Sequence, residues 1–424
     1  MTFELLAERT LIDAESASTR HVLVRIQAPA ADSDSERLPV NLAFVLDRSG
    51  SMQGEKIRLA REATLTAIRT LRERDRFSVV TYDDEVEVVV PATAATTEAR
   101  HEAERRLRDV TARRMTDLCG GWLAGCEEVA RGLDEGGVGR CLLLTDGLAN
   151  VGVTDHNELV GHARELAARR VETTTFGVGR DFDERLLDDM ADAGAGNFYF
   201  IEGAAQIPDF IASEVGEALE VVARDVQLVV AAPEGVRVSA LNNLACTQEG
   251  TRAIVTIGTL ISEQAFEVVL RLDFPGGALG GAELVSCSLT DRDEVLSAEA
   301  GALTFTYASA EESAAQVRER PVDRHVAAFS SAWARKRALE LNDRGRYDEA
   351  QAELREMARQ ILEFAGDDRV LQAMVEELAS IDPAYGRDMG LLLKKLHYAR
   401  AHGALKRRDF GGRAMRSFER FDEE

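Results

Sequence analysis

The sequence predicts an α/β protein: a doubly wound, mostly parallel sheet with helices on both faces, followed by an antiparallel β-sandwich and a C-terminal helical region. Three observations support this fold class. Between residues 38 and 221, short apolar runs alternate with stretches of helical periodicity, which is typical of parallel strands joined by helices. Between residues 225 and 307 the helical period is lost, and β-rich runs are separated by turn residues. Beyond residue 309 the chain is helical and highly charged.

The N-terminal segment reads as two strands and a loop. Residues 3–11 and 21–27 alternate loosely between apolar and polar side chains, and a polar, turn-like segment follows them. The helical region contains residues 339–350, which resemble one tetratricopeptide-like helix–turn–helix without a second copy. A plain helical hairpin is therefore favoured there. We divide the chain into four parts: strands in 1–37, the α/β domain in 38–221, the β-sandwich in 222–308, and the helical region with a basic tail in 309–424.

Within the α/β domain, two strands stand out. Asn41–Leu46 and Arg140–Thr145 are continuous apolar runs of the kind found in strands buried on both faces. Four weaker strands are expected at 77–82, 86–90, 172–178 and 197–201. Helices are expected near 57–71, 96–108, 118–133, 157–170, 183–191 and 207–221. In the sandwich, the expected strands are DVQLVVAA, VRVSAL, RAIVTIGTL, AFEVVLRLDF, AELVSCSL and ALTFTY.

Composition excludes several classes of protein. A net charge of −23 disfavours a general binder of nucleic-acid phosphates. The sequence has no apolar run of 18 residues and no signal-peptide pattern at its start, so a membrane span is not expected. Five cysteines without C-x-x-C spacing are expected to be reduced, which indicates the cytoplasm. Arginine supplies 46 of the 51 basic residues, a bias that we attribute to a G+C-rich bacterial genome.

Oxygen-bearing side chains follow both strong strands. Asp47, Ser49 and Ser51 form D-x-S-x-S directly after the first strand, and Asp146 follows the second. The carboxyl ends of neighbouring parallel strands meet at one sheet edge, so these groups are expected to face one crevice. Carboxylate and hydroxyl oxygens suit Mg²⁺. Alternatively, the serines only cap the next helix, and Thr116 is likewise either a helix N-cap, which local sequence favours, or a ligand hydroxyl.

These residues resemble the von Willebrand factor type A domain. The resemblance covers NLAFVLDRSGSMQGEKIRLAREA, DRFSVVTYDDEVEVVVP, MTDL, CLLLTDGLANVG and TTTFGVGRDFDERLL. It implies a Rossmann-like sheet and a metal-ion-dependent adhesion site formed by Asp47, Ser49, Ser51, Thr116 and Asp146. Magnesium is the implied cofactor, with Mn²⁺ or Ca²⁺ as alternatives. The family's usual Gly-Gly before the threonine is replaced by an Arg-Met pair, which puts the path of that loop in question.

Within the family, the chain resembles bacterial proteins labelled calcium-activated chloride channel homologues and the inter-alpha-trypsin inhibitor heavy chains. The channel label does not fit a chain without an apolar span. The strands at 3–11 and 21–27 have no place in the standard order of a type A sheet, whereas the sandwich has edges to cover. We therefore expect these strands to join the sandwich, so that the type A domain is inserted into it.

The resemblance implies a non-enzymatic module or adaptor that binds a partner's Asp or Glu through the metal, with AAA+ ATPases and multi-protein assemblies as frequent associates. A metal-dependent phosphoryl hydrolase is the alternative, but D-x-D phosphatases need an acid where this chain has Ser49. A scaffold with a purely structural metal is a third reading. Asp181 and Asp183 either line the crevice or cap a helix, and the basic stretch 394–420 either meets a partner, is solvated or packs on the chain's own acids.

Overall fold

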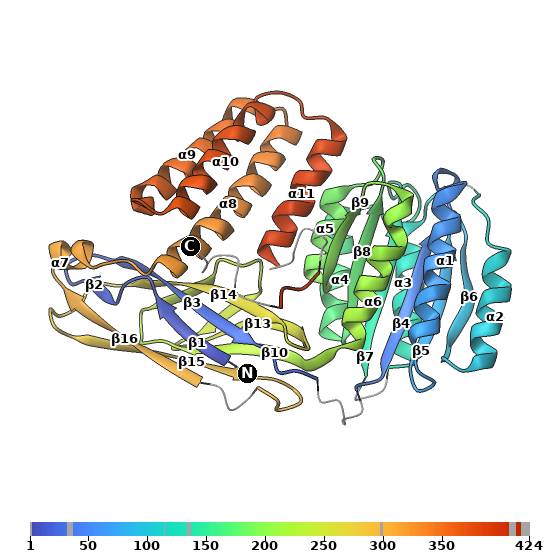
Figure 1. The fold of residues 1–424 in the computed structure, drawn as a ribbon, viewed down its shortest axis with the longest axis horizontal. Helices are drawn as coiled ribbons and strands as arrows, with labels where there is room; N and C mark the ends of the chain where they lie inside the picture. Colours follow the sequence, from blue (N-terminus) through green and yellow to red (C-terminus); the bar gives the residue numbers. More distant parts are fainter. Residues whose placement is uncertain are drawn as a thin grey trace.

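The computed structural model has three parts: an α/β domain, a β-sandwich beside it, and a helical region that lies over the sandwich and reaches the α/β domain (Figure 1). Each part surrounds its own cluster of buried apolar side chains. None of the helices in the described part of the chain is long and apolar enough to cross a bilayer. The structure describes residues 2–31, 37–113, 115–133, 137–296, 300–406 and 413–416.

The α/β domain contains a six-stranded sheet in the order β6-β5-β4-β7-β8-β9. All neighbouring strands are parallel except the edge pair β5 and β6, which are antiparallel. The two central strands carry the apolar runs that the sequence singled out, and both are buried along their whole length. The strands are β4 (Val40–Asp47), β5 (Arg76–Tyr82), β6 (Val86–Ala94), β7 (Val138–Thr145), β8 (Val171–Val178) and β9 (Ala195–Ile201).

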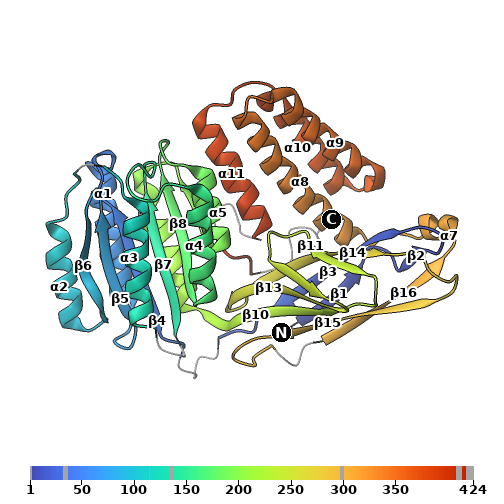
Figure 2. The same cartoon turned by 180° about the vertical axis from the view of Figure 1, so that it is seen from behind.

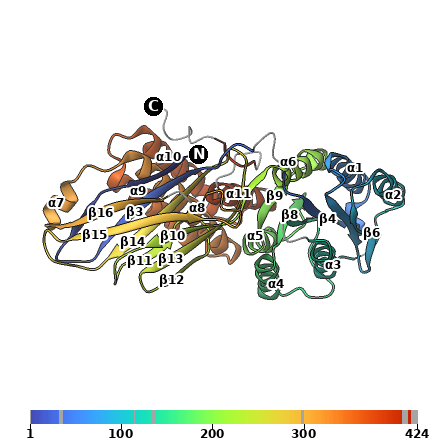
Figure 3. The same ribbon diagram turned by 90° about the horizontal axis from the view of Figure 1, so that it is seen from below.

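Helices cover both faces of this sheet, as expected for a doubly wound fold. One face carries α1 (Glu55–Thr70), α2 (Thr97–Arg108) and α6 (Ile207–Leu219), and the other carries α3 (Leu118–Arg131), α4 (His156–Ala168) and α5 (Glu184–Ala193) (Figure 3). The connections β4–α1 and β7–α4 leave the sheet at the edge that faces away from the sandwich (Figure 1). That edge is the carboxyl edge, where the oxygen-bearing residues lie.

The sandwich consists of two mostly antiparallel sheets. The first has the order β1-β3-β14-β11 and the second the order β12-β13-β10-β15-β16-β2. The strands are β1 (Thr2–Ala7), β2 (Leu11–Asp13), β3 (Ser18–Gln27), β10 (Val221–Ala231), β11 (Arg237–Ala240), β12 (Cys246–Glu249), β13 (Arg252–Ile261), β14 (Ala265–Phe274), β15 (Ala282–Thr290) and β16 (Ala300–Ala308). The sequence did not indicate β2 or β12 as strands of their own.

The N-terminal strands belong to the sandwich, as expected from its uncovered edges. Strand β3 pairs along its whole length with β14, from Ser18 opposite Phe274 to Gln27 opposite Ala265. Strand β1 pairs with the other side of β3, and the short β2 runs parallel to β16. The α/β domain is therefore inserted between two strands that share a sandwich, which ties its first and last residues to one rigid support.

Four long helices form the C-terminal region: α8 (Arg320–Asp343), α9 (Tyr347–Ala365), α10 (Arg369–Tyr385) and α11 (Leu391–Leu405), preceded by the short α7 (Ala310–Ala315). The tetratricopeptide-like segment is the turn between α8 and α9, and these helices form an antiparallel hairpin (Figure 2). Val322 and Phe329 of α8 are buried in a cluster with Leu23 of β3 and Val269 of β14. The hairpin is thus packed on the rest of the chain.

The described part of the basic stretch packs on the chain's own acids. Lys395 pairs with Glu184, and Lys406 pairs with Asp192, both on α5. Arg416 pairs with Glu220, just after α6. Residues 407–412 and 417–424 lie outside the described residues. Helix α11 therefore brings positive charge to the acidic surface of the α/β domain, which agrees with the internal-packing interpretation of this stretch.

Candidate metal centre

Two buried carboxylates lie at the carboxyl edge of neighbouring strands. Asp47 is the last residue of β4, and Asp146 directly follows β7. The two strands are paired in parallel, with Leu46 opposite Leu144, so both acids emerge at the same place. Both residues are fully buried. The convergence predicted from the sequence is therefore present.

The Asp47 carboxylate is held by two short hydrogen bonds. Its Oδ1 accepts the backbone N–H of Ser49 at 2.7 Å, and its Oδ2 accepts the hydroxyl of Thr145 at 2.7 Å. Burial raises the pKa of Asp47 to about 6, hydrogen bonds from Ser49 and Thr145 offset part of the rise, and repulsion from Asp146 adds to it. Among the described residues no cation is paired with Asp47. The carboxylate is thus fixed in position but lacks a counter-charge.

The two serines of the motif link the acids. Ser49 Oγ and Ser51 Oγ lie 3.1 Å apart, and the Ser51 hydroxyl donates to Oδ1 of Asp146 at 2.6 Å. A single 3₁₀ turn, Gly50–Met52, places the second hydroxyl next to the first. The motif therefore forms a continuous row of oxygen atoms from β4 to β7.

Thr116 joins this row from a third loop. It is not the helix cap that local sequence favoured, because Asp117 caps α3 by accepting the N–H of Gly120 at 2.9 Å. A Cβ atom placed on Gly147 would lie 3.7 Å from both Ser51 Oγ and Thr116 Oγ1. The two hydroxyls thus face the same small space, which a side chain at position 147 would enter.

The backbone of the Thr116 loop is held by a residue from the β7–α4 loop. Asn150 Oδ1 accepts the N–H of Thr116 at 2.9 Å, and the carbonyl of Thr116 accepts the N–H of Asn150 at 3.2 Å. This pair of hydrogen bonds settles the path of Thr116 itself, although Arg114 lies outside the described residues. The structure therefore brings all five predicted residues to one crevice.

Asp83, in the β5–β6 turn, ties the crevice loops together, and sequence reasoning gave it no such role. Its carboxylate pairs with Arg48 at 3.3 Å and with Arg113 at 3.0 Å, and its carbonyl accepts the N–H of Asp117 at 2.6 Å. Asp83 itself is buried. The loops that carry Ser49 and Thr116 thus share one acidic anchor, which fixes them relative to each other.

Lys56 is the second residue that sequence reasoning missed. Its Nζ lies 2.5 Å from Oδ2 of Asp146. It stands in the first turn of α1, where the helix dipole disfavours a positive charge unless an acid is close. That unusual position is the signal in the sequence from which an acidic neighbour could have been inferred.

The rim of the crevice exposes large apolar side chains. Met115, next to Thr116, is 51% exposed, and Leu148, two residues after Asp146, is 56% exposed. Asp183 caps α5 by accepting the N–H of Leu186 at 2.9 Å, which is one of the two roles expected for it. Asp181 is exposed to solvent.

The donor set fits a hard divalent cation. Two carboxylates and three hydroxyls supply oxygen atoms only, which matches the preference of Mg²⁺, Mn²⁺ and Ca²⁺. Asp47 is buried without a cation, a costly arrangement that a bound cation would relieve. These two observations support a metal at this crevice.

Comparison with known proteins identifies the domain. Residues 41–213 match the model of the von Willebrand factor type A domain. They form a von Willebrand factor type A domain. The chain is 30% identical to the uncharacterized protein YfbK of Escherichia coli K12 over 211 residues, 49% of this chain and 36% of that protein. It is 30% identical to inter-alpha-trypsin inhibitor heavy chain H1 of Mesocricetus auratus over 165 residues, 37% of this chain and 18% of that protein.

Solved structures resemble the whole chain. A von Willebrand factor type A protein from Catenulispora acidiphila has a TM-score of 0.74 at 18% identity, and the match covers 98% of this chain and 97% of that one. The arrangement of type A domain, sandwich and helices is therefore shared as a fold. The chain spans well under half of YfbK and of heavy chain H1, so their names carry no activity over to it.

A second cluster of potential ligands lies where α11 meets the type A domain. Asp188, Asp192 and His402 place a ligand atom each within 4.8 Å of one another. The N–H of Phe198 donates to Nε2 of His402 at 3.2 Å, so the ring proton is on Nδ1, which lies 2.6 Å from Asp188. Lys336 Nζ is 2.6 Å from the same carboxylate. The Asp188 carboxylate thus has the His402 ring and the Lys336 ammonium as its close partners, and we interpret the cluster as an ionic clamp between helices.

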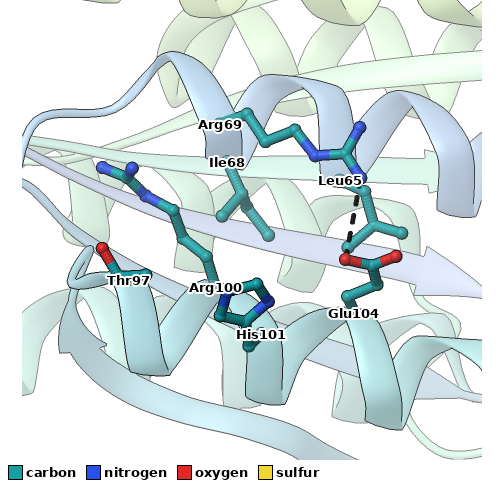
Figure 4. A pocket seen from close by; sticks show the side chains of 7 residues that line it. All are labelled: Leu65, Ile68, Arg69, Thr97, Arg100, His101 and Glu104. Carbon is teal, nitrogen blue, oxygen red and sulfur yellow. Dashed lines mark ion pairs between the residues drawn. The ribbon is translucent and has the colours of Figure 1, made fainter.

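Two cavities lie away from the crevice. A space of about 740 Å³ separates the amino edge of the type A sheet from the sandwich, and its acids Glu172, Asp192 and Asp225 are paired with cations of the chain. A groove of about 220 Å³ lies between α1 and α2, where Arg69 and Glu104 form an ion pair at 3.8 Å (Figure 4). Neither contains any of the five predicted site residues.

Proposed function

We propose that the chain is a non-enzymatic adaptor whose type A domain binds a carboxylate of a partner protein through a Mg²⁺-type ion. Asp47, Ser49, Ser51, Thr116 and Asp146 would hold the ion. When bound, it supplies an electrophilic site for an outside oxygen ligand. The chain's own residues orient the oxygen donors and present the surface around them.

One observation carries the proposal: five oxygen-bearing residues, two of them buried acids, come together on loops that also carry exposed apolar side chains. Met115 and Leu148 are more than half exposed beside the crevice. Exposed apolar groups next to a polar centre are typical of protein–protein contacts, in which apolar area supplies affinity and the polar group supplies specificity. A small phosphoester would leave both side chains without a partner.

The chemistry of the crevice supports binding rather than turnover. A phosphoryl hydrolase of the D-x-D type places its general acid where this chain has Ser49, and the Ser49 hydroxyl is engaged with Ser51. Asp47 is occupied at both oxygens by Ser49 and Thr145. We infer a partner in a multi-protein assembly, such as one built around an AAA+ ATPase, in the cytoplasm. All five cysteines are free thiols, which supports a reducing compartment.

The test is capture of a partner with and without metal. The full chain is immobilised in Mg²⁺ or in EDTA, and captured proteins are identified by mass spectrometry. The same is done for Asp47→Ala. A captured partner is then purified, its exposed acids are changed singly to amides, and its affinity is measured by calorimetry.

The rim is tested with matched surface variants. Met115→Ser and Leu148→Ser should each weaken the purified complex about tenfold, as expected from roughly 1–2 kcal/mol of lost apolar burial. Leu279→Ser removes a leucine of the sandwich that is still more exposed, at 71%, and should leave the affinity unchanged. Capture that survives both EDTA and Asp47→Ala contradicts the proposal. Metal-dependent hydrolysis of p-nitrophenyl phosphate that Asp47→Ala abolishes would identify an enzyme instead.

A further inference from the structure

The crevice already contains a cation that belongs to the chain. Lys56 Nζ pairs with Oδ2 of Asp146 at 2.5 Å, while Oδ1 of the same acid accepts the Ser51 hydroxyl. Asp146 is fully buried and the Lys56 side chain is 28% exposed, so the ammonium reaches the acid from the solvent side. The motif that carries the two serines runs directly into the helix that carries Lys56.

The ammonium fits between two loops. A Cβ atom on Gly179, in the β8–α5 loop, would lie 3.6 Å from Nζ of Lys56. Gly179 has a φ of +81°, a conformation that favours glycine, so this loop passes close to the ammonium with no side chain of its own in between. The space beside Asp146 is therefore shaped to admit the lysine.

The two carboxylates differ in whether a cation is paired with them. Asp146 has the ammonium, whereas Asp47 has only hydrogen-bond donors. Without Lys56, two buried like charges would share one crevice with no cation, which disfavours the folded state. With Lys56 in place, a divalent cation would enter a site that already holds one positive charge. Repulsion between the two then lowers metal affinity, unless the lysine moves away.

We propose that Lys56 is a tethered competitor of the divalent cation, which stabilises the metal-free crevice and sets its affinity for metal. This inference rests on the metal site of the proposed function. The lysine pairs with Asp146 when metal is absent and swings toward solvent when metal is bound. Its four-carbon stem and partial exposure allow that movement without a change in the backbone. Lys56 is thus a positioning residue, and the five oxygen-bearing residues are the ligands.

The variants that test this are Lys56→Met, which keeps the length of the side chain and removes the charge, and Lys56→Gln, which keeps a polar end. Arg58→Met is the matched control. It removes a cation two residues further along α1, where the partners are the exposed Glu55 and Glu62. Full-length proteins are titrated with MgCl₂ and MnCl₂ by calorimetry, and their thermal unfolding is followed in EDTA and in metal.

We expect Lys56→Met and Lys56→Gln to bind both metals about tenfold more tightly than wild type and to unfold at a lower temperature in EDTA. Arg58→Met should change neither. A lysine with only a structural role would lower stability in EDTA and leave metal affinity unchanged or weaker, and that result overturns the inference. If wild type binds metal and Asp47→Ala does not, the proposed site stands whatever Lys56 does. If none of the proteins binds metal, both proposals are wrong.

Discussion

Replacing Asp47 with asparagine should make the metal-free protein more stable at neutral pH. The carboxylate is fully buried and has no cation partner among the described residues. Asparagine is nearly the same size and can still accept the N–H of Ser49. The Thr145 hydroxyl, which now donates to Asp47, can turn toward the carbonyl of Gly147 at 3.4 Å. The substitution therefore removes a buried charge with little change in packing.

The size of the effect follows from the pKa of Asp47. Its pKa is raised from 3.8 to about 6, chiefly by burial. The folded protein thus keeps this proton up to about pH 6, whereas the unfolded chain releases it near pH 4. The free energy of unfolding of wild type consequently falls as pH rises through that window, by up to ~3 kcal/mol at 1.36 kcal/mol per pKa unit. Below pH 4 the contribution of Asp47 is favourable and constant.

The assay is urea unfolding in EDTA at several values of pH from 3.5 to 7.5. The stability of Asp47→Asn minus that of wild type should be small at pH 3.5 and should rise by about 1–3 kcal/mol by pH 7.5. Asp183→Asn is the control, because Asp183 only caps α5 and asparagine caps helices equally well. With Mg²⁺ at 100 times its Kd, wild type alone should gain about 2.7 kcal/mol. A difference that does not vary with pH would refute this reasoning.

The remaining predictions concern the clamp between helices and the packing of α3. Burial alone would raise the pKa of Asp188, but His402 and Lys336 outweigh the effect of burial and lower the pKa to about 2. The ionised Asp188 therefore stabilises the fold above pH 4, and this contribution is lost only in strong acid. Asp188→Ala leaves Lys336 without its nearest acid and should cost about 3–5 kcal/mol in urea unfolding at pH 7, and a loss below 1 kcal/mol would show that the clamp is dispensable. Gly125→Ala should destabilise by about 1–3 kcal/mol, because its Cβ would lie 2.2 Å from Val45. Gly161→Ala, in open space on α4, should stabilise the fold by up to ~1 kcal/mol. Thermal unfolding of both variants is the test, and a shift of the opposite sign in either variant would contradict the prediction made for it.

The parts of the fold that sequence could predict are those with local, periodic signals. Both central strands read as apolar runs because both of their faces are buried, and β4 and β7 are indeed buried throughout. The convergence of Asp47 with Asp146 follows from strand direction alone, since neighbouring parallel strands end at one edge. The likeness to the type A family added Thr116, for which local sequence favoured a different role.

What sequence could not predict depends on backbone geometry and on contacts that the local pattern does not show. Thr116 and its neighbour Asp117 are both residue types that cap helices, so local sequence could not decide between them. The backbone of the folded chain makes Asp117 the cap. The loop in which an Arg-Met pair replaces Gly-Gly is held by Asn150, 34 residues away. Strand β12 is only four residues long and carries polar residues on both faces, so no alternation was visible. In each case a local pattern was ambiguous and only the three-dimensional arrangement resolved it.

The few lysines of this chain lie where a cation from one element meets an acid of another. There are only five, against 46 arginines, and every one pairs with an acid on another element. Three of them, Lys336, Lys395 and Lys406, attach the helical region to acids of α5, and Lys394 pairs with Asp343 between α11 and α8. The fifth is Lys56 at the crevice. An arginine there could hold Asp146 through two parallel hydrogen bonds, and withdrawal would break both, whereas an ammonium is a compact point charge on a flexible stem. Most basic residues of this chain are arginines. A lysine beside Asp146 can neutralise the acid and can also withdraw its ammonium from the acid.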